Sequence, residues 1–249
     1  MNIGLYQSAS SLSALERWQD AVSQNITSSQ IPGFKKQTVS VGAEYAGELK
    51  GDPTQEVGHG EGTPMWYPRA SYGVSYANGD SNPTRREFDF AIGGAGFFTL
   101  RDQDGRMMYT RNGGFAMTPD RTIVSRQGFD VMVDGENTVQ LLPQGGKVTA
   151  DGEGNLFQNG VRLGQLEVVS FPDTNQLIPM GGGLFYAAEG VEPEPVDAPE
   201  VMQGYLESSN VEPLREMVDL VSIARAYEAN QKMISHRDKL LEKTIEKLG

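Results

Sequence analysis

Residues 215–248 contain neither glycine nor proline, although the 249-residue chain has 30 Gly and 13 Pro. Apolar and aromatic residues recur in this segment every seven positions, and a second seven-residue series lies three places earlier. The first series is Leu220, Tyr227, Ile234, Leu241 and Leu248, and the second is Met217, Ala224, Gln231, Asp238 and Ile245. Two such series predict a long helix with a coiled-coil-like seam that is interrupted at Gln231 and Asp238.

The residues before this helix carry start signals. Asn210 is a candidate N-cap, and Glu212 with Pro213 suits a first helical turn. We therefore assign residues 205–249 to a C-terminal helix.

A second amphipathic helix is predicted at the other end of the chain, within residues 1–34. Its apolar residues share one helical stripe, with Trp18 beside it. They are Leu5, Leu12, Leu15, Val22 and Ile26. Pro32 disfavours helical angles at Ile31 and Gly33 permits a turn, so the helix should end there. The serines between 8 and 13 are read as small side chains that permit close helix approach.

The middle of the chain reads as strands. Short alternating or β-branched runs are separated by turn sequences such as "DQDG", "TPDR" and "VDGEN", which predicts a central all-β domain over residues 84–204. Residues 35–83 are predicted to be a connecting arm, either an ordered loop or mobile. Residues 189–200 hold five acidic residues and three prolines, which predicts an extended linker. The expected fold class is α+β, with paired terminal helices.

Charge and composition limit the partners. A formal net charge of -12 opposes sequence-independent binding to nucleic acid or to an anionic membrane surface. No stretch approaches the roughly 20 apolar residues that a membrane span needs, so no membrane insertion is expected. The first residues lack the pattern of a cleavable signal peptide, so export, if it occurs, is expected without one.

Catalytic and cofactor chemistry is not expected. No paired carboxylates, metal cluster or nucleophile with its base emerges from the sequence, which predicts no enzyme, no metal and no cofactor. Residues 93–96, "GGAG", lack the rest of a phosphate-binding motif and favour a hairpin or a close contact. Residues 102–105, "DQDG", lack the glutamate of a calcium loop and favour a hairpin turn.

Two apolar stripes at opposite chain ends need cover, and the predicted β domain offers no other helix. Mutual pairing is the simplest solution, but the longer C-terminal helix leaves part of its seam over. Other copies of the chain could cover it. The alternative is that this helix folds onto the β domain.

Specific motifs carry a family resemblance. Residues 23–37, "SQNITSSQIPGFKKQ", and 204–234, "GYLESSNVEPLREMVDLVSIARAYEANQKMI", resemble the N- and C-terminal signatures of bacterial flagellar rod and hook axial proteins. Residues 89–118 and 163–177 are similar to the β domain of that family. Departures occur at Thr27, Ser28 and Ile31. The matching signature-turn residues are Asn25, Pro32, Gly33, Phe34 and Lys35.

The resemblance implies a structural subunit of the basal-body rod that self-assembles helically into the drive shaft from motor to hook. The chain length favours the proximal rod type over the distal type. Implied partners are copies of itself, other axial proteins of the rod and proximal hook, and the flagellar type III export apparatus. The implied location is the rod crossing the periplasm. The predicted assembly interface consists of the apolar residues of the two helical stripes. They are Leu5, Leu12, Leu15, Val22, Ile26, Met217, Leu220, Ala224, Tyr227, Ile234, Leu241, Ile245 and Leu248.

A second function class stays open. A β-rich adhesin or carbohydrate-binding module on an oligomerising helical stalk could use clustered aromatic residues to hold a sugar. These are Trp66, Tyr67, Tyr72 and Tyr76.

Overall fold

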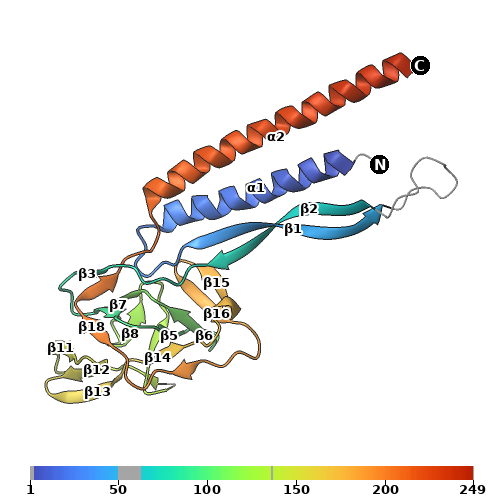
Figure 1. The fold of residues 1–249 in the computed structure, drawn as a ribbon. Helices are drawn as coiled ribbons and strands as arrows, with labels where there is room; N and C mark the ends of the chain where they lie inside the picture. The colour runs from blue at the N-terminus through green and yellow to red at the C-terminus, as the bar shows by residue number, and fades with distance from the viewer. Residues whose placement is uncertain (1–2, 50–62, 136, 249) are drawn as a thin grey trace. The chain divides into compact units, whose positions relative to one another are not determined.

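The computed structural model describes residues 3–49, 63–135 and 137–248 (Figure 1). The chain divides into two compact units. The first, which we call the helical unit, comprises Met1–Ile26, Gln37–Gly73 and Glu212–Gly249. The second, the β unit, comprises Thr27–Lys36 and Val74–Val211. The terminal helices contact each other and the central region is β-rich, which confirms the expected α+β class.

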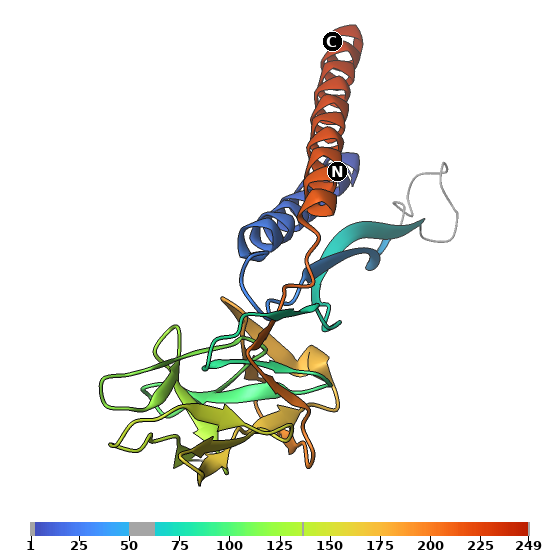
Figure 2. The ribbon, with the colours of Figure 1, turned by 90° about the vertical axis from the view of Figure 1, so that its left-hand side faces the viewer.

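The helical unit contains two helices and a long hairpin among its described residues. They are α1 (Ile3–Ser28), β1 (Gln37–Leu49), β2 (Thr63–Val74) and α2 (Pro213–Leu248). The strands β1 and β2 pair as a two-stranded sheet and run in opposite directions (Figure 1). Figure 2 shows the same elements from a second direction, with α1 again close to α2 and to the hairpin.

The hairpin replaces much of the predicted loop or arm at 35–83, and residues 50–62 of that arm lie outside the described residues. Its two faces differ because side chains alternate along a strand. On one face Tyr45 meets Trp66 with ring centroids 5.5 Å apart. On the other face Arg69 pairs with Glu44 at 2.8 Å. The prediction missed these strands because their glycines and polar residues resemble a loop.

The α2 helix begins at Pro213, at the first-turn position predicted for it. The assignment of a helix from residue 205 is too long, because Tyr205–Glu207 form a strand instead. The predicted N-cap, Asn210, is wrong, because the carbonyl of Glu212 accepts the first helical hydrogen bond, from the amide of Glu216 at 3.1 Å. Asn210 instead serves the β unit. Its side chain accepts from the Lys36 amide at 2.7 Å and donates to the Ser75 carbonyl at 2.8 Å.

The β unit is built from short strands joined mainly by tight turns. Its strands are β3 (Ser81–Pro83), β4 (Asp89–Ile92), β5 (Phe97–Arg101), β6 (Met107–Thr110), β7 (Gly113–Met117), β8 (Ile123–Ser125), β9 (Asp130–Val133), β10 (Asn137–Thr138), β11 (Val148–Ala150), β12 (Asn155–Gln158), β13 (Val161–Gln165), β14 (Val168–Ser170), β15 (Leu177–Gly181), β16 (Leu184–Ala187), β17 (Glu194–Pro195), β18 (Val201–Gln203) and β19 (Tyr205–Glu207). A short 3-10 helix, η1, spans Thr174–Gln176.

The main sheet has the strand order β15-β16-β6-β5-β9-β8-β7-β4-β18. Strand β5 shows how it is packed, since alternate residues face opposite sides. Phe98 and Leu100 belong to a large apolar cluster with Phe90, Ile123 and Leu156. Phe97 belongs instead to an aromatic cluster with Tyr109, Phe171 and Phe185. Both faces of this central strand are therefore buried.

The turn at 102–105 is the predicted hairpin turn between β5 and β6. The Asp102 carboxylate accepts hydrogen bonds from the amides of Asp104 and Arg106, at 2.9 and 2.8 Å. An aspartate that caps its own turn in this way is typical of tight connections.

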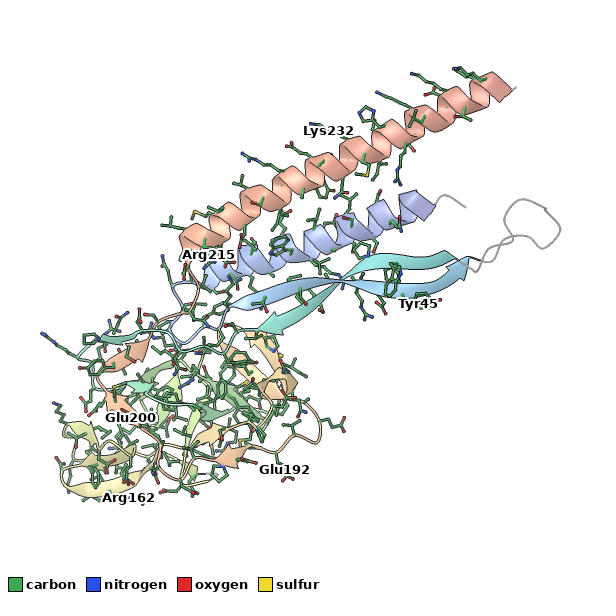
Figure 3. The ribbon with its side chains drawn as sticks, viewed as in Figure 1. Tyr45, Arg162, Glu192, Glu200, Arg215 and Lys232 are labelled. Carbon is green, nitrogen blue, oxygen red and sulfur yellow. The ribbon has the colours of Figure 1, made fainter. Side chains whose placement is uncertain are left out.

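The acidic segment 189–200 differs from the predicted free linker. Strand β17 pairs with β14, and the amide of Val196 donates to the carbonyl of Val168 at 3.0 Å. Val196 also packs against the large apolar cluster. Prolines that suit a linker also suit an edge strand, so composition alone could not separate the two. Figure 3 shows Glu192 and Glu200 on this segment of the β unit.

Candidate assembly interface

Helices α1 and α2 run antiparallel and are joined at two points (Figure 1). Asn25 Nδ2 donates to Glu216 Oε2 at 2.9 Å, and Asn230 Nδ2 donates to Ser11 Oγ at 3.3 Å. These contacts lie fourteen residues apart in each helix, which is two heptads. The two helices therefore keep one heptad register between the contacts.

The Asn25 side chain joins three segments of the helical unit. Besides its bond to Glu216, its Nδ2 donates to the Gln37 carbonyl at 2.8 Å, and its Oδ1 accepts from the Gln37 amide at 2.8 Å. Asn25 and Glu216 are both 0% exposed. A polar pair buried between helices stabilises one register, because a shift along the helix would leave both groups without these partners.

The α2 surface that faces α1 is only partly the predicted seam. Leu220, Tyr227 and Ile234 are half-buried, as the first predicted series requires. The second buried series is displaced by one residue from the predicted one. It comprises Glu216, Ile223, Asn230 and Arg237, whereas Met217, Ala224, Gln231 and Asp238 are exposed. The prediction followed apolar residues and therefore did not include the polar residues Glu216 and Asn230. As a result, the second predicted series lies one position away from the buried one.

On α1, the predicted apolar residues lie on or beside buried positions. Val22 is buried, and Leu12, Leu15 and Ile26 are half-buried. The sequence reading missed Ala14 and Ala21, which are also buried. The side chains of Leu5, Leu241, Ile245 and Leu248 lie outside the described residues.

The hairpin contacts an adjoining part of the α1 surface, since Gln7 lies one helical turn before Ser11, which binds α2. Ser10 Oγ donates to the Pro68 carbonyl at 2.6 Å, and Gln7 Nε2 donates to the Trp66 carbonyl at 3.1 Å. Ser8 and Ala70 are buried. Small side chains on both elements allow the helix to approach the strand closely, in line with the reading of the serines.

Several large apolar side chains are exposed among the described residues of the helical unit, and eight of them form two groups. The first, which we call the outer patch, lies at positions i, i+3, i+4 and i+7 on the first turns of α2 and so forms one helical face. It consists of Leu214, Met217, Val218 and Val221, of which Leu214 is 80% exposed. Beyond Val221 this face carries charged residues, including Lys232 (Figure 3). The second, the hairpin patch, consists of Val41, Tyr45, Trp66 and Tyr72, all exposed.

The signature turn lies in the β unit, apart from Asn25. Gly33 has φ +67°, and a Cβ there would lie 2.3 Å from the carbonyl carbon of Arg111. Its amide donates to the Glu207 carbonyl at 2.8 Å. Pro32 is half-buried and Phe34 is buried. Only glycine allows both this backbone angle and this close approach.

Lys35, the last residue of the signature turn, enters a buried ionic cluster. Its Nζ lies 2.7 Å from Glu207 Oε1, and Arg111 Nη1 lies 3.7 Å from Glu207 Oε2. Lys35 also donates to the Ala77 carbonyl at 2.8 Å, and the amide of Gly79 donates to Glu207 at 2.9 Å. The cluster fastens the residues after α1 to β19 and to the β6–β7 connection.

Burial lowers the pKa of Lys35, and its bond to Glu207 opposes that shift. Burial likewise lowers the pKa of Arg111, again opposed by the Glu207 charge. Sequence reasoning identified Lys35 but missed Arg111 and Glu207. The available signal was a lysine directly after buried Phe34, which requires a carboxylate partner when it is itself buried.

The proposed sugar-binding aromatics do not form one surface. Trp66 and Tyr72 belong to the hairpin patch, whereas Tyr67 lies on the other face of β2, where alternate side chains point. Tyr76 packs in the β unit, with its ring 5.9 Å from that of Phe97 and 5.6 Å from that of Phe185.

Within residues 3–49, 63–135 and 137–248, neither helix is long and apolar enough to cross a membrane. The same part of the chain contains no group of three His, Asp or Glu side chains placed to hold a metal ion.

Comparison with known proteins connects these features. Residues 202–247 match the family described as "Flagellar basal body rod FlgEFG protein C-terminal", and residues 91–161 match "Flagellar hook protein FlgE/F/G D1 domain". A flagellar basal-body rod protein FlgF of Caulobacter vibrioides is 30% identical over 249 residues, covering 100% of this chain and 99% of the relative. The chain belongs to the flagellar basal-body rod protein family.

Other rod proteins extend the likeness. FlgF of Rhizobium meliloti is 30% identical over 252 residues, covering 100% of this chain and 99% of the relative. FlgG of Borreliella burgdorferi is 28% identical over 267 residues and covers 95% of both chains. This chain is a flagellar basal-body rod subunit, and its family is structural, not enzymatic. Membership implies assembly with other axial flagellar proteins.

Proposed function

We propose that this chain is a subunit of the proximal rod, of the FlgF type. Three relatives that carry the FlgF name align with all of this chain and with 99% of their own length. Relatives named FlgG from Buchnera aphidicola align with 68% of it. FlgG of Borreliella burgdorferi also covers 95% of both chains, but its alignment is longer, at 267 residues, and 28% identical. The FlgF matches, at 29–30% identity over 249–255 residues, support the FlgF type.

The observation that carries the proposed mode of assembly is the outer patch of α2. Leu214, Met217, Val218 and Val221 lie on one helical face and stay exposed, although α1 and α2 are already paired. Removing such a face from water stabilises association by roughly 25 cal/mol for each Å² buried. A neighbouring axial subunit is the proposed cover.

The proposed assembly is helical and open-ended. The face of α2 that binds α1 is already covered within the chain. The outer patch is proposed to meet a different surface of the neighbouring subunit, and such a heterologous contact need not close into a dimer. In the assembled shaft, copies of this chain and other axial proteins of the rod and proximal hook would cross the periplasm and transmit torque. Export through the flagellar type III apparatus is part of this proposal.

Electron microscopy of basal bodies from cells lacking the gene tests it. Arrest before a complete rod, restored by the wild-type gene, is the expected result. Immunogold labelling of a tagged, functional copy should then mark the motor-proximal part of the rod. Label in the hook-proximal part would reject the proximal assignment, and complete rods in the deletion strain would reject the proposal.

A further inference from the structure

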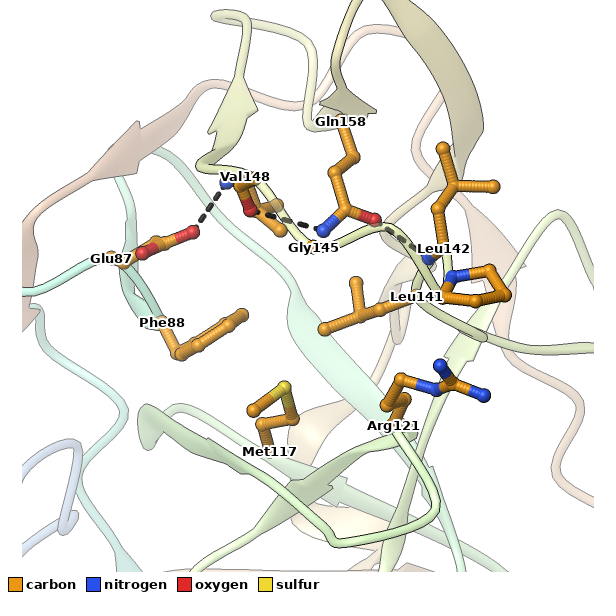
Figure 4. Close-up of a pocket in the computed structure, with 11 residues that line it drawn as sticks. Glu87, Phe88, Met117, Arg121, Leu141, Leu142, Gly145, Val148 and Gln158 are labelled. Carbon is orange, nitrogen blue, oxygen red and sulfur yellow. Dashed lines mark hydrogen bonds between the residues drawn. The ribbon is translucent and has the colours of Figure 1, made fainter.

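The β unit has an apolar cleft of about 250 Å³ on its surface (Figure 4). Phe88, Met117 and Leu141 contribute apolar walls, and the rim is held by partly buried polar contacts. Gln158 accepts from the Leu142 amide at 2.7 Å and donates to the Gly146 carbonyl at 3.0 Å, and Glu87 accepts from the Val148 amide. The cleft is smaller than the roughly 300 Å³ of the smallest drug-sized ligand sites, which suits a few protein side chains.

Basic side chains surround this cleft in an otherwise acidic protein. Arg121 lines it, and the exposed Arg86 and Lys147 directly adjoin the lining residues Glu87 and Val148. The acids at the cleft are the exposed Asp120 and the half-buried Glu87, whose carboxylate accepts from the Val148 amide. The cleft is therefore largely apolar inside, and bases outnumber acids at its rim.

The same unit carries an apolar protrusion at the other end of its main sheet. Strand β15 is the terminal strand of the sheet order in the described part of the chain. On it, Ile178 is 51% exposed and Met180 is 58% exposed. Pro179 between them lacks an amide hydrogen and the pairing shifts there, so docking by strand addition is disfavoured. A partner would therefore contact the side chains of β15 and would not pair with its backbone.

Acidic residues border this protrusion. Asp173 caps η1 just before β15, and the amide of Ala188 donates to the Gln176 carbonyl, which brings the exposed Glu189 beside the start of β15. The chain has no Lys or Arg between Arg162 and Arg215. Arg106 lies over the ring of Tyr186, which pairs with Ile178, but Arg106 is itself ion-paired with Asp102 and Asp104. The border of β15 is therefore mainly acidic, whereas bases outnumber acids at the cleft.

We infer that the cleft receives Ile178 and Met180 from the β15 edge of a second copy of this chain. Apolar side chains would fill an apolar cleft, and the acidic border of one copy would face Arg121 and Lys147 of the other. Cleft and edge lie at different places on one domain, so the contact is heterologous and can repeat from one copy to the next. The inference rests on the proposed function only in requiring neighbouring copies.

The natural absence of cysteine permits a direct test. Full-length M117C and M180C variants, carrying different tags, are mixed under mild oxidation, and the mixed disulfide is quantified. The control mixes V161C with M180C, because Val161 is 51% exposed and lies outside both surfaces, while Met117 is 53% exposed. A several-fold excess of mixed product over the control is expected. Equal yields would overturn the inference.

Charge reversal tests the identity of the occupant. Arg121→Glu in the M117C chain should lower the mixed yield by up to about fivefold, as expected for one exposed ion pair, and Asp173→Arg in the M180C chain should restore it. A yield insensitive to both changes would reject β15 as the occupant. If rods assemble but the mixed disulfide does not exceed the control, this inference fails alone. If the disulfide forms but cells without the gene build complete rods, only the proposed function fails.

Discussion

Asn25 donates a hydrogen bond to the buried carboxylate of Glu216 at 2.9 Å across 191 positions of sequence. Replacing Asn25 by leucine should therefore lower the free energy of unfolding of the helical unit by about 3 kcal/mol, because it removes one partner of a buried charge. Both tryptophans, Trp18 and Trp66, lie in this unit, so their fluorescence during urea unfolding reports on it.

The matched control is Gln24→Leu, at the exposed neighbouring position on α1. The double variant N25L/E216L should recover much of the loss, since apolar residues of similar size tolerate burial better than an unpaired carboxylate. Equal losses for N25L and Q24L would contradict a register-setting role for Asn25.

Gly33 tests the signature turn in the same manner. Gly33→Ala should cost at least about 2 kcal/mol, because alanine disfavours φ +67° and its Cβ would overlap the Arg111 backbone. The methyl NMR signals of buried Met108 and Met132 follow unfolding of the β unit. Gly152→Ala, in the same unit, is the control, since a Cβ there meets nothing within 4 Å. A G33A variant as stable as G152A would show that the turn tolerates a side chain.

The heptad and turn signals predicted the parts of this fold that follow local rules. Pro32 and Gly33 predicted that α1 ends just before them, and Pro213 predicted the start of α2. These signals are local, because each proline restricts the backbone directly. The pairing of the two terminal helices could be predicted from the sequence because each helix has one apolar stripe. Their register could not be predicted, because it depends on Asn25 and Glu216, and these polar residues do not contribute to the periodic apolar pattern.

The hairpin and the ionic cluster depend on distant partners. Strand β1 could not be predicted from the sequence because its glycines and short polar residues resemble a loop. Its apolar face is recognisable only when β2 lies beside it. Lys35 is part of the signature turn, but no neighbouring residue in the sequence indicates that its partner is Glu207, which is 172 residues away. Nonlocal ion pairs of this kind leave no spacing in the sequence.

The outer patch yields a prediction that separates folding from assembly. Val218→Lys should leave the free energy of unfolding within about 0.5 kcal/mol of wild type, because the position is already exposed. Rod formation and motility should be lost, because a charge would be buried at the contact. Complementation of a deletion strain measures both. Ser235→Lys, which adds the same charge at an exposed position outside the patch, should support motility, and normal rods with V218K would remove this patch from the interface.

Ionisation of Tyr76 should make the free energy of unfolding of the β unit depend on pH in the alkaline range. Burial raises the pKa of Tyr76 from 10.0 to about 12. Between these values the unfolded chain binds fewer protons than the folded one, so the free energy of unfolding falls as pH rises. Tyr76→Phe should make this fall shallower. Near neutral pH it should be neutral or stabilising, because the buried hydroxyl has no hydrogen-bond partner among the described residues.

Chemical denaturation at several pH values between neutrality and pH 12 checks both parts of this prediction. Tyr205→Phe, at an exposed position of the same unit, serves as the control. A Y76F variant whose stability falls as steeply as wild type above pH 10 would show that ionisation of Tyr76 is not coupled to folding.

Amide hydrogen exchange on the monomeric chain should separate the two units. The β unit buries two apolar clusters around β5, so the amides of β5 and β6 should exchange only on global unfolding of that unit. The helical unit buries few large apolar side chains, Val22 and Ile223 among them, and leaves the outer patch in water. Helices without a covered apolar face open at little cost, so α1 and α2 should exchange faster. Incorporation into rods should then slow exchange in both helices, because neighbouring subunits cover the exposed face. Uniform slow exchange along the monomer would show that the helical unit is complete by itself, and assembly would then need another source of free energy.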